Sequence, residues 1–520
     1  MANSGSAPAS LRTSAAYGFY ALALLTCVNL LSYINRSVIF SLFTPIERDL
    51  HLRDFHVGWL ASAYVLVYSL FALPLGILSD LRSRRAVVAA GIALWSVFTA
   101  LGGLSEGFGS LVFSRAMVGV GGAAAAAAAT SLVADYYPGQ RRAFAMGIYQ
   151  AGIALGGVLG ILLGGQLEAV YGWRVALMAV GLPGFALAFL AGRLTDPIRE
   201  PSRLSLRRNL EELGVRLTSL VRFLLPLLAG IAGGALAAYL LDRRYGGRSA
   251  ADAAGFALCV GVGLALNIRQ WVLQAKAQAA GAPRDAATAV VEAAFDDVMR
   301  ATRVVLQTPT LAYIFVGGAL ISFGINGLVG WAPTYMSRAL GVSIGRGSVL
   351  LGKWGLIFGI LGTLFGGFLA DWSRRYYAAG RVLVVAAGFL IGAPLAAWLL
   401  TIRDIELFVP VFCAAFFFLT WYSGPLTAAI FDVVPARVNA TVVGAYLLFI
   451  HLAGDTISFP IVGALSDRFG IERATILLPA VGMLGGLVVL GAARTVRRDM
   501  ERAAQATGEW RVDAGHRPAG

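Results

Sequence analysis

Charged residues are scarce in this sequence of 520 residues. They make up 13% of it, against roughly 25% in soluble domains, while 58% of the residues are hydrophobic. The mean hydropathy of +0.74 agrees with this imbalance. The composition excludes an ordinary soluble domain and indicates a chain built for lipid.

Cysteine and lysine are also rare. Cys27, Cys259 and Cys413 all fall in apolar runs without the spacing of a disulfide or a metal site. Only two lysines occur, so the net charge of +14 comes from arginines in short clusters between apolar runs. Such clusters are typical of cytoplasmic loops in membrane proteins, so we do not expect a nucleic acid as a partner. The apolar runs carry no nucleophile–base pair or phosphate loop, so we expect neither an enzyme nor a cofactor.

Apolar runs long enough to cross a bilayer recur along the chain, since about 20 residues suffice. We expect membrane helices at roughly 17–43, 56–79, 86–104, 109–134, 142–167, 173–194, 311–336, 347–370, 382–402, 405–431, 438–465 and 474–493. The first run is too long for the core of a signal peptide. Arginine-rich loops alternate with weakly charged ones, which predicts a multi-pass protein of the cell inner membrane with both termini in the cytoplasm.

The two sets of six runs are copies of one another. The segment Gly76–Asp80 matches Gly367–Asp371 at an offset of 291 residues. Further along, Tyr149 matches Tyr446 at 297, and Gly172 matches Gly470 at 298. Two six-helix halves in the same orientation are the parallel-repeat arrangement of one large class of transporters. We expect a tail, a first bundle, an intervening segment, a second bundle and a final tail at 1–16, 17–195, 196–309, 310–494 and 495–520.

The intervening segment carries two further apolar runs, Phe223–Leu241 and Ala253–Val272. If both span, the chain has fourteen membrane helices, which is the arrangement we expect. If they form a hairpin at the bilayer surface, the count is twelve. The arginines of the turn between them would lie outside in the spanning arrangement, against the usual charge bias.

The eleventh run carries two ionisable residues near its middle, His451 and Asp455, four residues apart and so on one helix face. An acid at that depth costs about 3 kcal/mol on insertion scales, so it should face protein or water. Either the pair exchanges a proton during the working cycle, or it is a buried hydrogen bond that fixes this helix. In the repeat, Asp455 aligns with Val158, so the first half has no such acid.

Polar residues at membrane depth elsewhere are candidates for a substrate or coupling site. Arg36 and Arg115 sit at similar depth in the first and fourth runs. They either extend to the interface or face the central cavity and bind an anionic group, which guanidinium geometry suits. Asn35 and Asn326 could line the same cavity or bridge helices.

Two loops resemble the signature loop of the major facilitator superfamily. The first runs Gly76-Ile-Leu-Ser-Asp80-Leu-Arg-Ser-Arg84-Arg85, and its copy runs Gly367-Phe-Leu-Ala-Asp371-Trp-Ser-Arg374-Arg375. An aspartate that pairs with arginine or a helix end in one conformation only would act as a latch during alternating access. The resemblance implies the all-α major facilitator fold and no particular substrate.

Three stretches resemble bacterial members of the spinster-like branch of that superfamily. They are Asn29 to Arg36, Arg115 to Gly122, and Val433 to Asp467 with its His451 and Asp455. The resemblance implies export of lysophospholipid-like amphiphiles, often with protons. The family usually has an acid where this chain has Asn35 and where it has Gly122, so coupling by the family route is in doubt.

We therefore expect an amphiphile transporter that works by alternating access, with Asp455 as the candidate proton site. Its expected partners are a lipid or other small-molecule substrate, the lipid bilayer and a proton, and the chain is expected to be monomeric. One alternative is an organic-anion:cation symporter, whose first helix also carries an asparagine-rich, arginine-containing signature. The other is a non-transporting receptor or scaffold of the same fold.

Overall fold

The computed structural model describes residues 15–81, 83–137, 141–195, 304–435 and 438–515, with isolated residues between 225 and 273. All regular structure in these residues is helical, which confirms the predicted all-α class. Eleven of the described segments are long and apolar enough to cross a membrane. One of them, Phe144–Gly192, contains two of the predicted runs, separated by a kink at Gly172.

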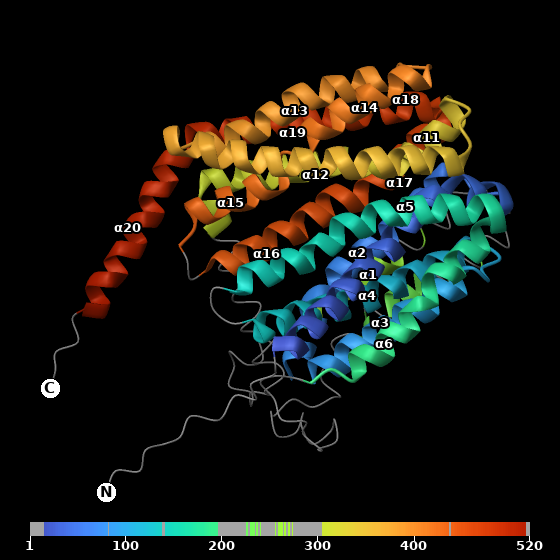
Figure 1. Ribbon diagram of the computed structural model, residues 1–520, viewed down its shortest axis with the longest axis horizontal. Helices are drawn as coiled ribbons and strands as arrows, with labels where there is room; N and C mark the ends of the chain where they lie inside the picture. The colour runs from blue at the N-terminus through green and yellow to red at the C-terminus, as the bar shows by residue number, and fades with distance from the viewer. Residues whose placement is uncertain are drawn as a thin grey trace, which may run out of the picture. The chain divides into compact units, whose positions relative to one another are not determined.

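The described residues fall into two compact units. In Figure 1 unit 1 is blue to green, and unit 2 is yellow to red except for its blue segment Arg53–Val65. Unit 1 lies within Met1–Leu52 and Leu66–Val290, and unit 2 within Arg53–Val65 and Val291–Gly520. Helix α2 (Asp54–Leu81) therefore begins in unit 2 and ends in unit 1.

Unit 1 contains α1 (Ala15–Asp49), α3 (Arg84–Gly102), α4 (Phe108–Tyr136), α5 (Arg141–Gly181) and α6 (Pro183–Gly192). Helices α1 and α5 pack closely because α5 turns small residues toward α1. A Cβ added at Gly156 would lie 2.4 Å from the carbonyl oxygen of Leu30. The buried amide of Asn29 also donates to the carbonyl oxygen of Tyr149, at 2.9 Å, and so joins the two helices.

Unit 2 contains α11 (Pro309–Ala339), α12 (Ile344–Tyr376), α13 (Gly380–Leu399), α14 (Ile405–Leu419), α15 (Ser423–Val433), α16 (Asn439–Ile450), α17 (Thr456–Phe469), α18 (Ile471–Thr475), α19 (Leu477–Gly491) and α20 (Val496–Gly515). A turn of π-helix, His451–Asp455, joins α16 to α17. A short 3₁₀ turn, Ala492–Arg494, connects α19 to α20.

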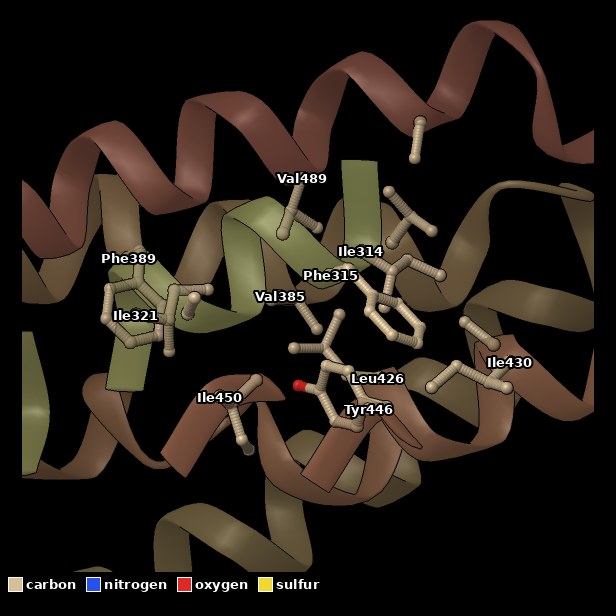
Figure 2. Close-up of a cluster of buried hydrophobic side chains, with 14 of the residues drawn as sticks. Ile314, Phe315, Ile321, Val385, Phe389, Leu426, Ile430, Tyr446, Ile450 and Val489 are labelled. Carbon is tan, nitrogen blue, oxygen red and sulfur yellow. The ribbon is translucent and has the colours of Figure 1, made fainter. Parts of the chain in front are cut away.

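The core of unit 2 forms where α11 meets α13, α16 and α19 (Figure 2). Phe315 and Tyr446 meet there edge to face, with ring centroids 5.5 Å apart. Val385, Phe389 and Val489 belong to the same cluster, and Phe389 lies away from this ring pair in the view. Because lipid tails are as apolar as these side chains, close van der Waals packing rather than escape from water holds the helices together.

Three helix breaks fall just before prolines. Helix α5 ends two residues before Pro183, and α14 and α18 end shortly before Pro425 and Pro479. A proline ring clashes with the carbonyl four residues earlier and lacks an N–H, so the helix ends or kinks there. The three breaks lie inside the predicted runs 173–194, 405–431 and 474–493, and the membrane spans continue across them.

The matched glycines of the repeat share one backbone conformation. Gly172 has φ 81° and Gly470 has φ 83°, both in the left-handed region where side chains are strained. Each ends one long helix and lets the chain turn into the next. This agreement supports the internal repeat seen in the sequence.

The predicted two-helix insert lies mostly outside the described residues. Whether it spans, and whether the count is fourteen or twelve, stays a prediction, as do the domain boundaries at 195 and 310. The described residues between 225 and 240 and between 255 and 273 are helical. A Cβ at Gly230 would lie 2.6 Å from the carbonyl oxygen of Cys259, so these two segments approach closely.

Candidate functional site

Asp455 is a fully buried acid in unit 2 (0% exposed). Its Oδ1 accepts hydrogen bonds from Ser322 Oγ and, at 2.9 Å, from Asn326 Nδ2. Its Oδ2 lies 2.7 Å from His451 Nδ1. We call these four side chains, two from α11 and two from the π-helical turn, the Asp455 cluster. The sequence had singled out three of them and missed Ser322, one helical turn before Asn326.

The Asp455 cluster can hold a carboxyl group in either charge state. An ionised carboxylate without partners is strongly disfavoured at this depth, but Ser322 and Asn326 donate to this one, and His451 does so in the tautomer that carries a proton on Nδ1. The imidazole of His451 is 24% exposed, whereas Asp455 is closed off. The imidazole is therefore the more accessible member of this hydrogen-bonded pair.

The turn that carries this pair is not α-helical. The backbone N–H of Thr456 donates to the carbonyl of His451, five residues earlier, and the Thr456 hydroxyl donates to the same oxygen at 2.8 Å. Ser62, in the part of α2 that belongs to unit 2, donates to the carbonyl of Thr456 at 2.7 Å. Such single π turns occur often at functional sites.

The structure corrects the register predicted for Asp455 in the repeat. A Cβ at Gly454 would meet the carbonyl of Ala319 and the Cβ of Ser322, just as one at Gly156 would meet Leu30 and Tyr33. These two glycines are therefore equivalent, 298 residues apart. Asp455 corresponds to Gly157, not to Val158, because the π turn takes in one extra residue.

The predicted residues of unit 1 lie together around the α1 backbone. Arg115 is buried, and its guanidinium donates to the carbonyl oxygens of Asn35 (3.0 Å) and Arg36 (3.2 Å). Asn35 donates to the carbonyl of Leu31 at 2.9 Å, and its own Oδ1 is buried without a hydrogen-bond partner. Arg36 is half-buried beside the ring of Tyr33, at 5.6 Å. Arg115 thus fixes α4 against α1, while Arg36 is the more accessible cation.

The first signature loop forms one ion pair and one hydrogen bond within unit 1. Arg84 binds Asp135 on α4, and Arg85 donates to the carbonyl of Leu194 at 3.2 Å. The side chain of Asp80 lies outside the described residues. A Cβ at Gly76 would make only an ordinary contact with α4, 3.9 Å from Ala127.

The second copy forms the corresponding pairs in unit 2 through another arginine. Arg381 bridges Asp371 (2.9 Å) and Asp432 (2.7 Å), the latter being the repeat equivalent of Asp135. Arg374 reaches the same Asp432 at 3.4 Å and lies 3.6 Å from the sulfur of Met500. The side chain of Arg375 is exposed, and a Cβ at Gly367 would have no atom within 4 Å. The sequence had counted Arg381 only as a charged loop residue.

A second buried acid in unit 2 was also missed. Asp54, at the start of α2, accepts from Arg338 (2.8 Å) and from Ser466 (2.5 Å). Asp467 in turn accepts from the backbone N–H groups of Asp54 and Phe55, and so caps α2. The adjacent Ser466 and Asp467 at the end of a membrane helix were the signal that could have revealed this contact.

The chain is similar to known transporters along most of its length. The model of the Major Facilitator Superfamily matches residues 25–455. Protein spinster of Drosophila melanogaster is 29% identical over 205 residues, which cover 39% of this chain and 34% of that protein. An MFS-type efflux pump of Mycolicibacterium smegmatis is 25% identical over 490 residues, 92% of this chain and 94% of the pump.

The fold is also similar to a solved structure. A bacterial homolog of the human lysosomal transporter spinster, crystallised in an inward-facing and unoccupied conformation, matches with a TM-score of 0.69 at 21% identity. The match covers 94% of this chain and 99% of that one.

Proposed function

Because this chain belongs to the major facilitator superfamily, we propose that it carries an amphiphilic, lysophospholipid-like substrate across the cell inner membrane. The family implies membrane transport by alternating access between two conformations. The substrate class rests on the likeness to spinster proteins and on the half-buried cation Arg36, which suits an anionic headgroup. We further propose a monomer with both termini in the cytoplasm.

The observation that carries the proposal furthest is the Asp455 cluster. A fully buried carboxyl that accepts from Ser322 and Asn326, with a partly exposed imidazole at hydrogen-bond distance, is a site where one proton can bind and leave. If the two conformations of the carrier differ in how accessible His451 is, proton binding and transport become linked. We therefore propose that the substrate moves in exchange with, or together with, a proton held at Asp455.

The test uses the full chain reconstituted in sealed phospholipid vesicles. Transfer of a labelled lysophospholipid would be measured with and without a pH gradient, beside small aromatic acids as competing substrates. We expect the lysophospholipid to move faster than in protein-free vesicles and to respond to the gradient. Transport of the aromatic acids alone would contradict the proposed substrate, and binding without transport would contradict the proposed activity.

Asp455→Asn removes the proton site while keeping the size of the side chain. The part of the rate that depends on pH should fall by roughly tenfold or more, within the range of ordinary coupling energies. Transport that remains equally pH-dependent in this variant would show that the coupling group lies elsewhere.

A further inference from the structure

The motif of the two signature loops occurs a third time, near the end of α17. Gly463-Ala-Leu-Ser-Asp467 repeats the glycine, leucine, serine and aspartate of Gly76-Ile-Leu-Ser-Asp80 at the same spacing. The first copy ends α2, whereas the third copy contacts the residues that begin α2. The same motif therefore lies at both ends of one helix, supplied at the second end by unit 2.

The third copy binds the first turn of α2 through its aspartate and its glycine. Asp467 accepts from the backbone N–H groups of Asp54 (2.9 Å) and Phe55 (3.2 Å), and so caps the helix. The guanidinium of Arg53 lies 3.9 Å from the same carboxylate. A Cβ at Gly463 would clash with the carbonyl oxygen of Asp54, so only glycine allows this close approach.

The side chain of Asp54 adds a second set of bonds at the same place. It is 4% exposed, and its Oδ2 accepts from Arg338 on α11 at 2.8 Å and from Ser466 at 2.5 Å. Both partners belong to unit 2, and Arg53–Val65 is the only stretch before residue 291 that is grouped with that unit. The bonds of this turn therefore explain why α2 begins in unit 2.

The contact continues along one face of α2 toward the π turn. Asp54, Gly58 and Ser62 follow one another at intervals of four residues, so they share a helix face. A Cβ at Gly58 would lie 2.5 Å from the carbonyl oxygen of Phe459. The fully buried Ser62 donates to the carbonyl of Thr456, the first residue after the π turn. The start of α2 thus covers α17 from its last turn back to the π turn.

We propose that Asp54–Ser62 is a strap over this face of α17, that the third copy of the motif is the latch that holds it, and that release of the strap admits water beside the π turn during transport. This proposal rests on the proposed transport activity and adds one of its moving parts. A carrier that alternates needs contacts that are made in one conformation and broken in another. The latch suits this task because its groups are polar, so water can replace each bond that breaks.

The test follows a cysteine placed under the strap. Ser62→Cys is introduced into the full chain after its three native cysteines have been replaced by alanine. The purified protein in lipid nanodiscs is then treated with N-ethylmaleimide. The reaction needs a thiolate, and so water at this position. We expect slow alkylation while the strap is closed and faster alkylation in every variant that releases it.

Gly463→Ala is the main release variant. The added methyl group meets the carbonyl of Asp54, so the strap must move and the alkylation rate should rise roughly tenfold. Gly367→Ala is the matched control, because it is the same change in the second copy of the motif, where a Cβ would have no atom within 4 Å. Equal rates in these two variants would overturn the proposal. If Gly463→Ala does not fold, the polar variants decide.

The polar variants weaken the latch without adding volume. Asp54→Asn removes the charge that binds Arg338, so the rate should rise about tenfold. Asp467→Ala should raise it about fivefold, and Asp467→Asn by less, because asparagine also caps. Glu472→Gln is the control, since it breaks an exposed ion pair with Arg403 elsewhere in unit 2 and should leave the rate unchanged. Unchanged rates in Asp54→Asn and Asp467→Ala would overturn the proposal.

A lysophospholipid then links the strap to transport. Added to the Ser62→Cys protein, it should raise the alkylation rate severalfold, because turnover brings the strap into its released position more often. A transported lysophospholipid that leaves the rate unchanged would show that the strap does not move in the cycle, and the proposal fails. If nothing is transported while the latch variants still speed alkylation, the proposed function fails and the strap is supported.

Discussion

The same helix pair is built in two ways in this molecule. In unit 1, the part of α5 before its kink at Gly172 is α-helical and packs against α1, joined by glycines and by the amide of Asn29. In unit 2, α16 and α17 meet α11 through a π turn that carries a buried acid bonded to Ser322, Asn326 and His451. Close packing is common to both pairs, while the ionisable group belongs to one.

The difference between these two helix pairs shows that a charged side chain inside a membrane protein needs partners that replace water. The acid of unit 2 occurs where a widened turn and two polar side chains on α11 supply partners. The buried cation of unit 1, Arg115, uses backbone carbonyls instead, and the neutral Asn35 stands beside it. Both of these charges therefore lie where the backbone or neighbouring side chains can stabilise them.

The largest effect should follow from placing an acid in unit 1. Gly157→Asp puts a carboxylate at the position of Asp455 without its donors, so the free energy of unfolding should fall by about 3 kcal/mol. Unfolding in detergent measures this, with Gly157→Asn as the neutral control of similar size. Adding Ser37→Asn, which mimics Asn326, should recover part of the loss. Equal stability of the acid and amide variants would contradict the comparison.

The two arginines of unit 1 should respond differently to neutral replacement. Arg115→Gln loses charged hydrogen bonds to two carbonyls, which should lower stability by about 2 kcal/mol. Arg36→Gln should lower stability less than Arg115→Gln, because Arg36 is the less buried of the two, and should raise the KM for an anionic amphiphile roughly tenfold, which corresponds to about 1.4 kcal/mol. Unfolding and transport measured on both variants check this division. The reverse pattern would assign the substrate contact to Arg115.

A titratable group introduced into unit 1 should change the pH profile of transport, because both units would then carry a buried acid. Asn35→Asp places a buried acid next to the peptide group that Arg115 binds. The pH profile of transport should then show a second step besides the one from Asp455. Asn35→Ser, which adds no acid, is the control. A single step in the Asp variant would mean that this position is not linked to transport.

The smallest effect concerns a buried acid that caps a helix instead of exchanging a proton. Asp499 on α20 accepts from the backbone N–H and hydroxyl of Thr310 at the start of α11. Asp499→Ala should lower stability by about 1 kcal/mol, and Asp499→Asn by less, because asparagine also caps. The pH profile should not change in either variant. A shifted profile would show that burial alone, without the π turn, suffices for coupling.

Much of the site could be predicted from residue types and spacing. The pair His451 and Asp455 was found because two ionisable residues share one face of an apolar run. The superfamily assignment and the spinster resemblance are confirmed by the comparisons. The roles of Asn35, Arg36, Arg115 and Asn326 and of the latch residues stay predictions.

Other parts could not be predicted, because they depend on which residues face each other across helices. Ser322 is an ordinary serine in an apolar run until α11 packs against the π turn. Arg381 was one loop arginine among several until it met Asp371 and Asp432. The change in offset from 297 to 298 was visible, but it did not say which turn held the extra residue.

The sequence by itself determined that this chain is a helical transporter with two related halves and one acid near mid-membrane. Those conclusions follow from composition, periodicity and repeated motifs, which are local properties. Only the tertiary structure decided that Asp455 has hydrogen-bond partners on α11 and corresponds to Gly157, because hydrogen-bond partners and helix register arise from packing between distant segments.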